Sequence, residues 1–252
     1  MKKVTIVALT KFPDIWSAFQ RNIRDYVPAE VQRIVVVDGI NVKPVAPWRV
    51  IRGPKVFSMA GNYNLGMRAA DDDSDLFVMN DDITFITPDP IERLQELAYS
   101  DPIVGAVACR VTVGRVGNPL QEKPRTDRPL TFVKTCGNGC TYFKREVINE
   151  IGYMDEDLAG AYGAEDADYM WRVNMAGYRV AIARDVHVKH GYGEIRTYGA
   201  THSATSLRTL GQKLQDTNKI GVEKFKAKWG HFDVHGEWNS SYTECPHCGG
   251  KL

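Results

Sequence analysis

Hydrophobic and polar positions form alternating blocks along the first half of the chain. Short, mostly apolar runs at 4–9, 33–37 and 76–79 are typical of buried strands. Between them, apolar residues recur at helical spacing over 13–26 and 58–70. Because strands that alternate with helices indicate βαβ units, this half of the chain predicts a mainly parallel sheet with helices on both faces.

The second half continues the pattern with shorter elements. It predicts helices over 88–98, 144–151 and 165–176, and strands over 103–113, 131–135, 140–143, 179–183 and 186–189, with one more strand around 48–51. The predicted fold class is therefore α/β, a sandwich over residues 1–200. A basic helical extension over 201–230 and a tail bearing Cys and His over 231–252 are expected to follow it.

Composition describes an ordinary soluble globular protein, with 43% hydrophobic residues, 25% charged residues and a net charge of +1. No apolar run approaches the ~20 residues that span a bilayer, so no integral membrane segment is expected. The basic, then apolar, start of the chain is read as a first strand and not as a signal peptide, because Lys11 follows at once. The five cysteines, an odd number, argue against a disulfide framework and for a reducing, cytoplasmic compartment.

Three predicted strands end in side chains that can act as ligands, namely Asp38, the run Asn80-Asp81-Asp82, and His190. In open α/β sheets, ligands bind outside the carboxyl ends of the strands. Carboxylates are rarely buried unless they are paired or bind a metal. We therefore expect Asp82 to hold a divalent cation, and the cation to hold a phosphate.

Glu165 and Asp166 open the predicted helix over 165–176. The positive end of the helix dipole favours an ionised carboxylate there, which is the state that a general base needs. The alternative is that the two carboxylates only cap the helix. Together with the strand-end ligands and the Gly137-Asn138-Gly139 loop, the pair favours catalysis.

Several segments resemble family 2 glycosyltransferases. The acceptor-side segment of that family is similar to Gly137-Asn-Gly-Cys-Thr-Tyr-Phe-Lys-Arg-Glu-Val-Ile-Asn-Glu-Ile-Gly-Tyr-Met-Asp-Glu-Asp157, to Tyr162-Gly-Ala-Glu-Asp-Ala-Asp168 and to Trp171-Arg-Val-Asn-Met-Ala-Gly-Tyr-Arg-Val180, followed by His190. Upstream, Val36-Val-Asp38, Asn64-Leu-Gly66 and Met79-Asn-Asp-Asp-Ile83 fall in the family's order and spacing. The resemblance covers about residues 3–192.

The resemblance implies a GT-A fold, a nucleotide-binding sandwich that takes a nucleoside-diphosphate sugar. On its donor side, Asp38 would contact the base or ribose, and Asn64 would lie near the nucleotide. Asn80 and Asp82 would be the outer positions of the family's Asp-x-Asp motif, with Asp82 on the metal and His190 completing the metal site. The chain departs from the motif at Asn80, where Asp is common.

On the acceptor side, the resemblance implies that Asp166 is the catalytic base and that Glu165 contacts substrate. One displacement with one base would invert the anomeric centre. Oxygen ligands with one imidazole suit Mn²⁺ or Mg²⁺ and favour Mn²⁺. Two alternatives stay open: a nucleotide-sugar or carbohydrate-binding module without turnover, and a nucleotidyltransferase on a similar fold. The second would want a glycine-rich phosphate loop after the first strand, which residues 9–14 lack.

The tail carries His231, His235, Cys245 and Cys248. Two interpretations stand side by side, a structural zinc site of the tetrahedral kind and a tail with reduced thiols.

The acceptor is open too. Basic residues at 115, 123, 125, 128 and 134, and the lysine-rich stretch beyond 213, would suit an anionic acceptor, such as a phosphorylated glycan or a hydroxymethylated base in DNA. A solvated basic surface is the alternative.

Overall fold

The structure, a computed structural model, describes residues 2–11, 13–39, 42, 46–54, 58–113, 118–159, 164–191 and 218–238. Its strands are β1 (Val4–Thr10), β2 (Gln32–Val37), β3 (Trp48–Arg52), β4 (Asp75–Asn80), β5 (Ile83–Phe85), β6 (Val104–Val113), β7 (Leu130–Val133), β8 (Cys140–Phe143) and β9 (Arg179–His190). Its helices are α1 (Pro13–Tyr26), α2 (Met59–Ala69), α3 (Pro90–Tyr99), α4 (Pro119–Glu122), α5 (Arg145–Ile151), α6 (Glu156–Ala159), α7 (Glu165–Met175) and a C-terminal helix over 218–229. In the part of the chain that is described, no helix is long and apolar enough to cross a bilayer.

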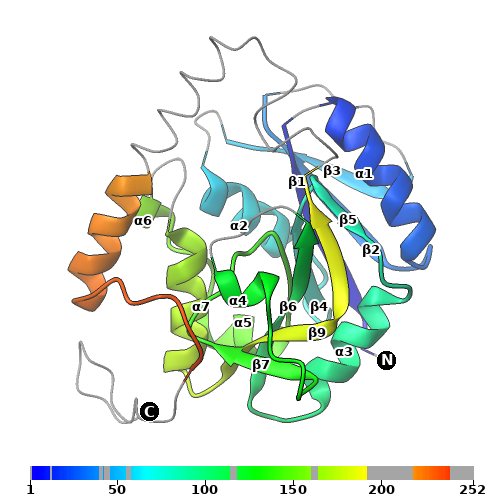
Figure 1. Ribbon diagram of the computed structural model, residues 1–252. Helices are drawn as coiled ribbons and strands as arrows, with labels where there is room; N and C mark the ends of the chain where they lie inside the picture. The colour runs from blue at the N-terminus through cyan, green and yellow to red at the C-terminus, as the bar shows by residue number, and fades with distance from the viewer. Residues whose placement is uncertain are drawn as a thin grey trace.

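All nine strands belong to one sheet, in the order β3-β2-β1-β4-β8-β6-β9-β5, with β7 beside β9 (Figure 1). β1 pairs in parallel with β2 and β4, and β2 with β3, as predicted. Beyond β4 the sheet is mixed, so the expectation of a mainly parallel sheet holds only in part: β9 runs parallel to β6. There β8 runs antiparallel to β4 and β6, and β5 and β7 run antiparallel to β9. These strands have three or four residues, and so short an apolar run carries no information on strand direction.

β9 is one continuous strand of 12 residues, although the pattern predicted two. Its register against β6 jumps between the pairs Ala108↔Ile182 and Arg110↔His187, so β9 bulges between them. The first part of β9 pairs with β7, and its last residues pair with β5 in the register Ile83↔His190. The bulge therefore lets one strand serve two neighbours and brings His190 beside the residue that follows Asp82.

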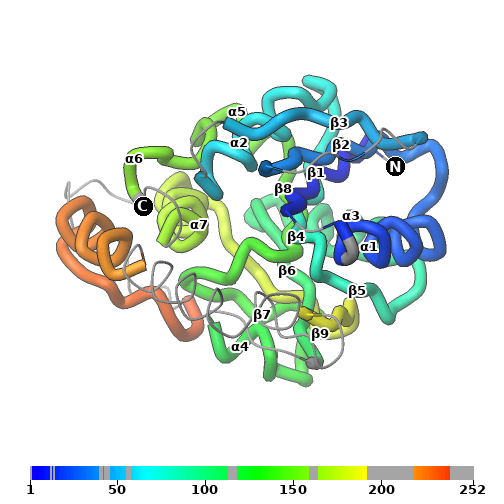
Figure 2. The backbone as a smooth tube through the Cα atoms, turned by 90° about the horizontal axis from the view of Figure 1, so that it is seen from above, coloured from blue at the N-terminus to red at the C-terminus, as the bar shows by residue number. Residues whose placement is uncertain are grey.

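Helices cover both faces of the sheet, as Figure 2 shows from above. On one face, α1 and α3 bury Phe19 and Leu94 in one apolar cluster. On the other, α2, α5 and α7 bury Tyr63, Val147 and Tyr169 in a second cluster. α2 lies so close to the sheet that a Cβ built on Gly66 would stand only 2.3 Å from Val7 Cγ1, so this position needs a glycine.

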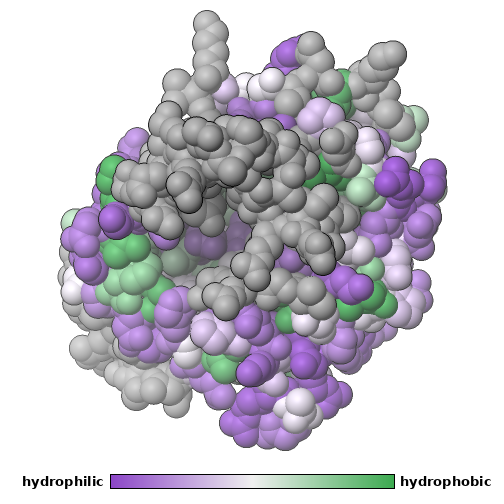
Figure 3. All heavy atoms as spheres, turned by 45° about the horizontal axis from the view of Figure 1, so that its top comes forward, coloured by the Kyte–Doolittle hydropathy of each residue, from purple (hydrophilic) through white to green (hydrophobic). Residues whose placement is uncertain are grey.

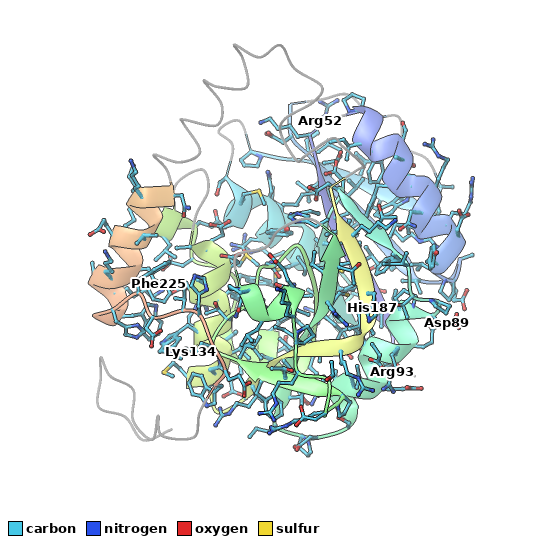
Figure 4. All side chains as sticks on the ribbon, viewed as in Figure 1. Arg52, Asp89, Arg93, Lys134, His187 and Phe225 are labelled. Carbon is cyan, nitrogen blue, oxygen red and sulfur yellow. The ribbon has the colours of Figure 1, made fainter. Side chains whose placement is uncertain are left out.

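The C-terminal segment (218–238) packs against α7 and β7 (Figures 1 and 4). Phe225 on its helix points toward α7 and belongs to an apolar cluster with Trp171. Beyond the helix, the Trp238 N–H donates to Phe132 O at 3.0 Å, and the Lys134 N–H donates to Gly236 O at 3.1 Å. The described part of the expected extension and tail is thus packed on the sandwich. Residues 201–217 and 239–252, with Cys245 and Cys248, lie outside the described residues.

Candidate active site

The polar ends of β2, β4 and β9 gather at the carboxyl edge of the sheet, at the top of Figure 1. Figure 3 turns this edge toward the viewer, and hydrophilic side chains (purple) are visible near its centre. The sequence-predicted residues Asp38, Asn80, Asp82 and His190 all come from these strand ends. The fold thus brings together side chains that are more than one hundred and fifty residues apart in the chain.

Asp82 is the most deeply buried carboxylate at this edge, with only 2% of its surface exposed. Within the described residues, neither of its carboxylate oxygens has a hydrogen-bond partner. His190 Nε2 lies 3.4 Å from Asp82 Oδ2, and the Gly191 N–H donates to Asp82 O at 2.8 Å, which fixes the two strand ends together. A buried carboxylate without donors is unfavourable unless something binds it, so the pair fits a divalent cation.

The described residues offer that cation no third His, Cys, Asp or Glu. Two protein ligands leave most coordination positions to water and to substrate phosphates, which is how Mg²⁺ is commonly held. We call the pair of Asp82 and His190 the Asp82 site.

Asn80 and Gly139 form the rim of the Asp82 site. Asn80 Oδ1 accepts a hydrogen bond from the Tyr63 hydroxyl, and the Asn80 N–H donates to Gly139 O at 2.9 Å. A Cβ built on Gly139 would lie 3.5 Å from Asn80 Nδ2 and 4.0 Å from His190 Nε2. The bare backbone of Gly139 therefore keeps open the space beside Asn80 and His190.

Asp38 and Asp81 lie on either side of the end of β1. Lys11 Nζ forms an ion pair with Asp38 Oδ2 at 2.6 Å. Asp81 turns toward β1, where the Thr10 hydroxyl donates to Asp81 Oδ2 at 2.5 Å. Burial raises the pKa of Asp81 to about 8, and the Thr10 hydroxyl opposes the shift.

Asn64 has a different place from the one that the resemblance implies. It is fully buried on α2, where its Nδ2 donates to Met154 O at 2.9 Å and to Glu156 Oε1 at 2.8 Å. Its Oδ1 accepts from the Met154 N–H at 2.9 Å. These bonds connect α2 to the segment between α5 and α6. Because they occupy the Asn64 amide, we do not propose that Asn64 contacts the nucleotide directly.

Asp166 stands in the first turn of α7, as predicted. The preceding Ala164 has a φ of +63°, in the left-handed region, which is a strained conformation for alanine. Asp166 Oδ1 accepts from the Ala167 N–H at 2.7 Å, and the backbone N–H of Asn138 also acts to lower the pKa of this carboxyl. Burial nevertheless raises the pKa of Asp166, although these N–H groups and the charge of His235 lower it. The helix end was expected to favour the ionised carboxylate, and burial works against that effect.

Asp166 lines a cavity of about 330 Å³, which we call the Asp166 cavity. Glu165, 5% exposed, lines it as well, as does Gly137. The opposite wall comes from the C-terminal segment and is formed by Asn218, Val222, Phe232, Val234 and His235. The sequence indicated His235 only as a possible zinc ligand and gave the other four residues of this wall no role.

Asn138 is a further candidate that sequence reasoning passed over. Its neighbour Gly137 lines the Asp166 cavity, and its other neighbour Gly139 accepts the hydrogen bond from the Asn80 N–H. Its side chain is only 4% exposed, and neither amide atom has a hydrogen-bond partner among the described residues. The Gly137-Asn138-Gly139 loop therefore lies between the Asp82 site and the Asp166 cavity, and its glycines were the signal in the sequence.

The basic residues expected to face an anionic acceptor are largely paired with carboxylates. Arg125 pairs with Asp127 at 2.7 Å and lies 3.7 Å from Glu237. Lys134 pairs with Asp233, as its position between β7 and the C-terminal segment in Figure 4 suggests. Arg115 lies outside the described residues.

The two histidines of the expected zinc set have separate surroundings. The His231 ring stacks edge-on against Trp171, with 4.7 Å between centroids, and burial lowers the pKa of His231. His235 instead lines the Asp166 cavity. Their cysteine partners fall outside the described residues, so the zinc interpretation stays a prediction.

No family model matches the chain, and neither does any curated protein. Solved structures do. The mannosyltransferase PcManGT from Pyrobaculum calidifontis, in complex with GDP-Man and Mn²⁺, matches with a TM-score of 0.64 and 17% identity, over 92% of this chain and 66% of that one. GalNAc-T7 with UDP, GalNAc and Mn²⁺ matches with a TM-score of 0.63 and 12% identity, over 79% of this chain and 46% of that one.

A third structure, S. aureus TarS 1-349 in complex with UDP-GlcNAc, matches with a TM-score of 0.56 and 12% identity, over 90% of this chain and 73% of that one. The chain thus spans about two-thirds of the mannosyltransferase and less than half of GalNAc-T7. At these identities the likeness establishes the fold: the chain has the GT-A-type fold of these glycosyltransferases.

Proposed function

We propose that this protein is a metal-dependent, inverting glycosyltransferase that moves a sugar from a nucleoside-diphosphate sugar to an acceptor hydroxyl. One observation carries the proposal. The buried Asp82, with neither carboxylate oxygen hydrogen-bonded by a described residue, lies beside His190 at the sheet edge, and the Gly137-Asn138-Gly139 loop bonds to Asn80 at one end and lines the cavity of Asp166 at the other. The ligands in the neighbouring structures, GDP-Man, UDP and UDP-GlcNAc, two of them with Mn²⁺, support a nucleotide-sugar donor.

The donor half of the proposal uses the sheet edge. Asp82 and His190 would hold Mn²⁺ or Mg²⁺, and a cation bound there supplies positive charge against the diphosphate leaving group. Asp38, at the end of β2, would accept a hydrogen bond from the base or ribose. Asn80 would contact the ribose or the sugar through its amide, oriented by the Tyr63 hydroxyl.

The acceptor half uses Asp166. The acceptor oxygen attacks the anomeric carbon from the face opposite the diphosphate, and the bond from that carbon to the phosphate oxygen breaks. Asp166 takes the proton from the attacking hydroxyl, and the electron pair of the broken bond leaves with the diphosphate. A single displacement of this kind inverts the anomeric centre. The raised pKa of Asp166 brings this base closer to a working pH, where proton transfer is efficient.

A screen of nucleotide sugars tests the proposal. Thermal stabilisation and hydrolysis are measured for each donor with Mn²⁺ and with chelator. We expect one donor to give both signals only with the metal. Asp166→Asn should keep the metal-dependent stabilisation and lose transfer by about 10²–10⁴-fold, the usual contribution of a general base. Near-normal transfer by this variant would exclude Asp166 as the base, and the lack of any metal-dependent donor would exclude the function.

A further inference from the structure

The Asp166 cavity has two walls from distant parts of the chain. One is the catalytic side, with Glu165 and Asp166 at the start of α7. The other is the C-terminal segment, which contributes Val222 and Asn218 from its helix and Phe232, Val234 and His235 from the residues after it. The cavity would be open on that side without the segment, so its shape depends on residues outside the sandwich predicted over 1–200.

The second wall is fixed to the same helix that carries the base. Trp229 Nε1 donates to Asp168 Oδ1 at 2.8 Å, and Lys228 Nζ lies 2.9 Å from the same oxygen and 2.7 Å from Asp155 Oδ2. Asp168 is fully buried and lies two residues from Asp166. The segment is therefore held in a set position relative to the base.

A second anchor joins the wall to the loop that follows β7. The Thr135 hydroxyl donates to Val234 O at 2.7 Å, and Thr135 is only 4% exposed. The Trp238 N–H extends the contact along β7 through Phe132 O. The two anchors fix the wall at both ends, one through side chains on α7 and one through backbone at β7, which is how a preorganised binding surface is built.

The charges on the described lining of the cavity disfavour an anionic ligand. The described residues that line it include two carboxylates, Glu165 and Asp166, and one imidazole, His235, but no Lys or Arg. Basic side chains nearby are occupied, as Lys134 is by Asp233 and Lys228 is by Asp155 and Asp168. A phosphate or carboxylate placed beside Asp166 would meet like charge in a partly buried site.

Size and surface chemistry fit one small ring bearing hydroxyl groups. A volume of about 330 Å³ lies at the lower end of small-molecule sites, which run from about 300 to 1,000 Å³. Phe232 and the two valines give the cavity apolar lining, and Glu165 and Asp166 give it carboxylates. A pyranose has that pairing, with C–H groups on its faces and hydroxyls at its edge.

We propose that the C-terminal segment is the acceptor-selecting wall of the enzyme, and that the Asp166 cavity takes one neutral sugar unit with a C–H face on Phe232 and a hydroxyl at Asp166. This inference rests on the proposed function, because it names the acceptor of the same site. It assigns acceptor binding to residues 218–238, where the sequence indicated only possible zinc ligands at His231 and His235 and a basic stretch.

The test uses the full chain and the donor found by the metal-dependent screen. Acceptor probes are methyl glycosides of glucose, galactose, mannose and N-acetylglucosamine, the matching 6-phosphates and uronates, and DNA that contains hydroxymethylcytosine. We expect transfer to at least one neutral glycoside, and a kcat/KM at least tenfold lower for its charged counterparts. Better transfer to a charged glycoside or to the DNA, or transfer to no probe, would overturn the neutral sugar class.

Phe232→Ala tests the wall itself. It should raise the KM for the neutral glycoside about tenfold and leave the KM for the donor within twofold. Val222→Thr keeps the side-chain volume but makes the wall more polar, and it should also raise the acceptor KM. This second variant keeps the test valid if Phe232→Ala fails to fold. Ile220→Ala is the control, because Ile220 lies on the same helix outside the cavity and is 51% exposed. Equal changes in donor and acceptor KM, or an unchanged acceptor KM in both wall variants, would contradict the assignment. If the wild-type chain bound no nucleotide sugar in the presence of the metal, the proposed function itself would be refuted.

Discussion

Gly139 offers a substitution with opposite effects on stability and on donor binding. Its φ lies outside the left-handed region, so alanine fits the backbone. The new methyl would meet Asn80 Nδ2 at 3.5 Å, Ile83 Cδ1 at 3.8 Å and His190 Nε2 at 4.0 Å, which are ordinary contacts with no clash. Gly139→Ala therefore removes freedom from the unfolded chain without strain in the folded one. A gain of about 0.4–1 kcal/mol is expected from that effect.

The same methyl occupies space at the rim of the Asp82 site. In a domain of this size, the gain in stability corresponds to a melting temperature higher by about 1–4 °C. Nucleoside-diphosphate binding in the presence of Mn²⁺, measured by calorimetry, should weaken at least tenfold, about 1.4 kcal/mol.

Gly152→Ala is the matched control for this experiment. Gly152 has a φ of +76° and open space around its Cβ position. With a ψ of −159° this backbone lies in a region that essentially only glycine adopts, so the control should lose about 1–3 kcal/mol of stability and keep donor affinity. Unchanged donor affinity in Gly139→Ala would refute the placement of the donor beside Asn80 and His190.

Three further predictions concern the base, the wall and the fold. The kcat/KM for transfer should fall as pH drops through the pKa of Asp166. Because burial raises this pKa, the midpoint of the fall should lie above the ordinary Asp value of about 3.9. A midpoint at or below that value would contradict the effect of burial. Trp229→Phe removes the 2.8 Å hydrogen bond to the buried carboxylate of Asp168, so urea unfolding should show a loss of about 1.5–3 kcal/mol in stability. Kinetics should show a raised KM for the acceptor. A change in stability with an unchanged acceptor KM would show that this anchor does not affect acceptor binding. Gly66→Ala places a Cβ 2.3 Å from Val7 Cγ1 and should cost about 1–3 kcal/mol while donor KM stays constant; a neutral effect would show that α2 can move away from the sheet.

Local signals predicted the elements well where they were complete. Ser58 was expected to begin a helix, and its hydroxyl accepts from the Gly61 N–H at 3.0 Å, one turn into α2. The apolar run after residue 75 forms β4, buried until Asn80. The direction of β8 and the bulge that makes β9 one strand could not be read from the pattern, because pairing partners and register are set by tertiary contacts.

The candidate site shows the same division. Residues at strand ends, such as Asp82 and His190, could be predicted because parallel strands bring their ends to one edge. Asn64 could not be placed, since its partners Met154 and Glu156 follow it by about ninety residues and consume its amide in the fold. The wall around Phe232 could not be predicted either, because packing against α7, and no local motif, brings that residue to the cavity.

The proposed metal-dependent glycosyl transfer depends most on the binding of a cation at Asp82. Calorimetric titration of the wild-type chain and of Asp82→Ala with a nucleoside diphosphate, each with Mn²⁺ and with chelator, tests it directly. We predict binding by the wild-type chain that requires Mn²⁺, and loss of the metal-dependent part in Asp82→Ala with an unchanged fold by circular dichroism. Equal, metal-dependent binding by both proteins would contradict the account.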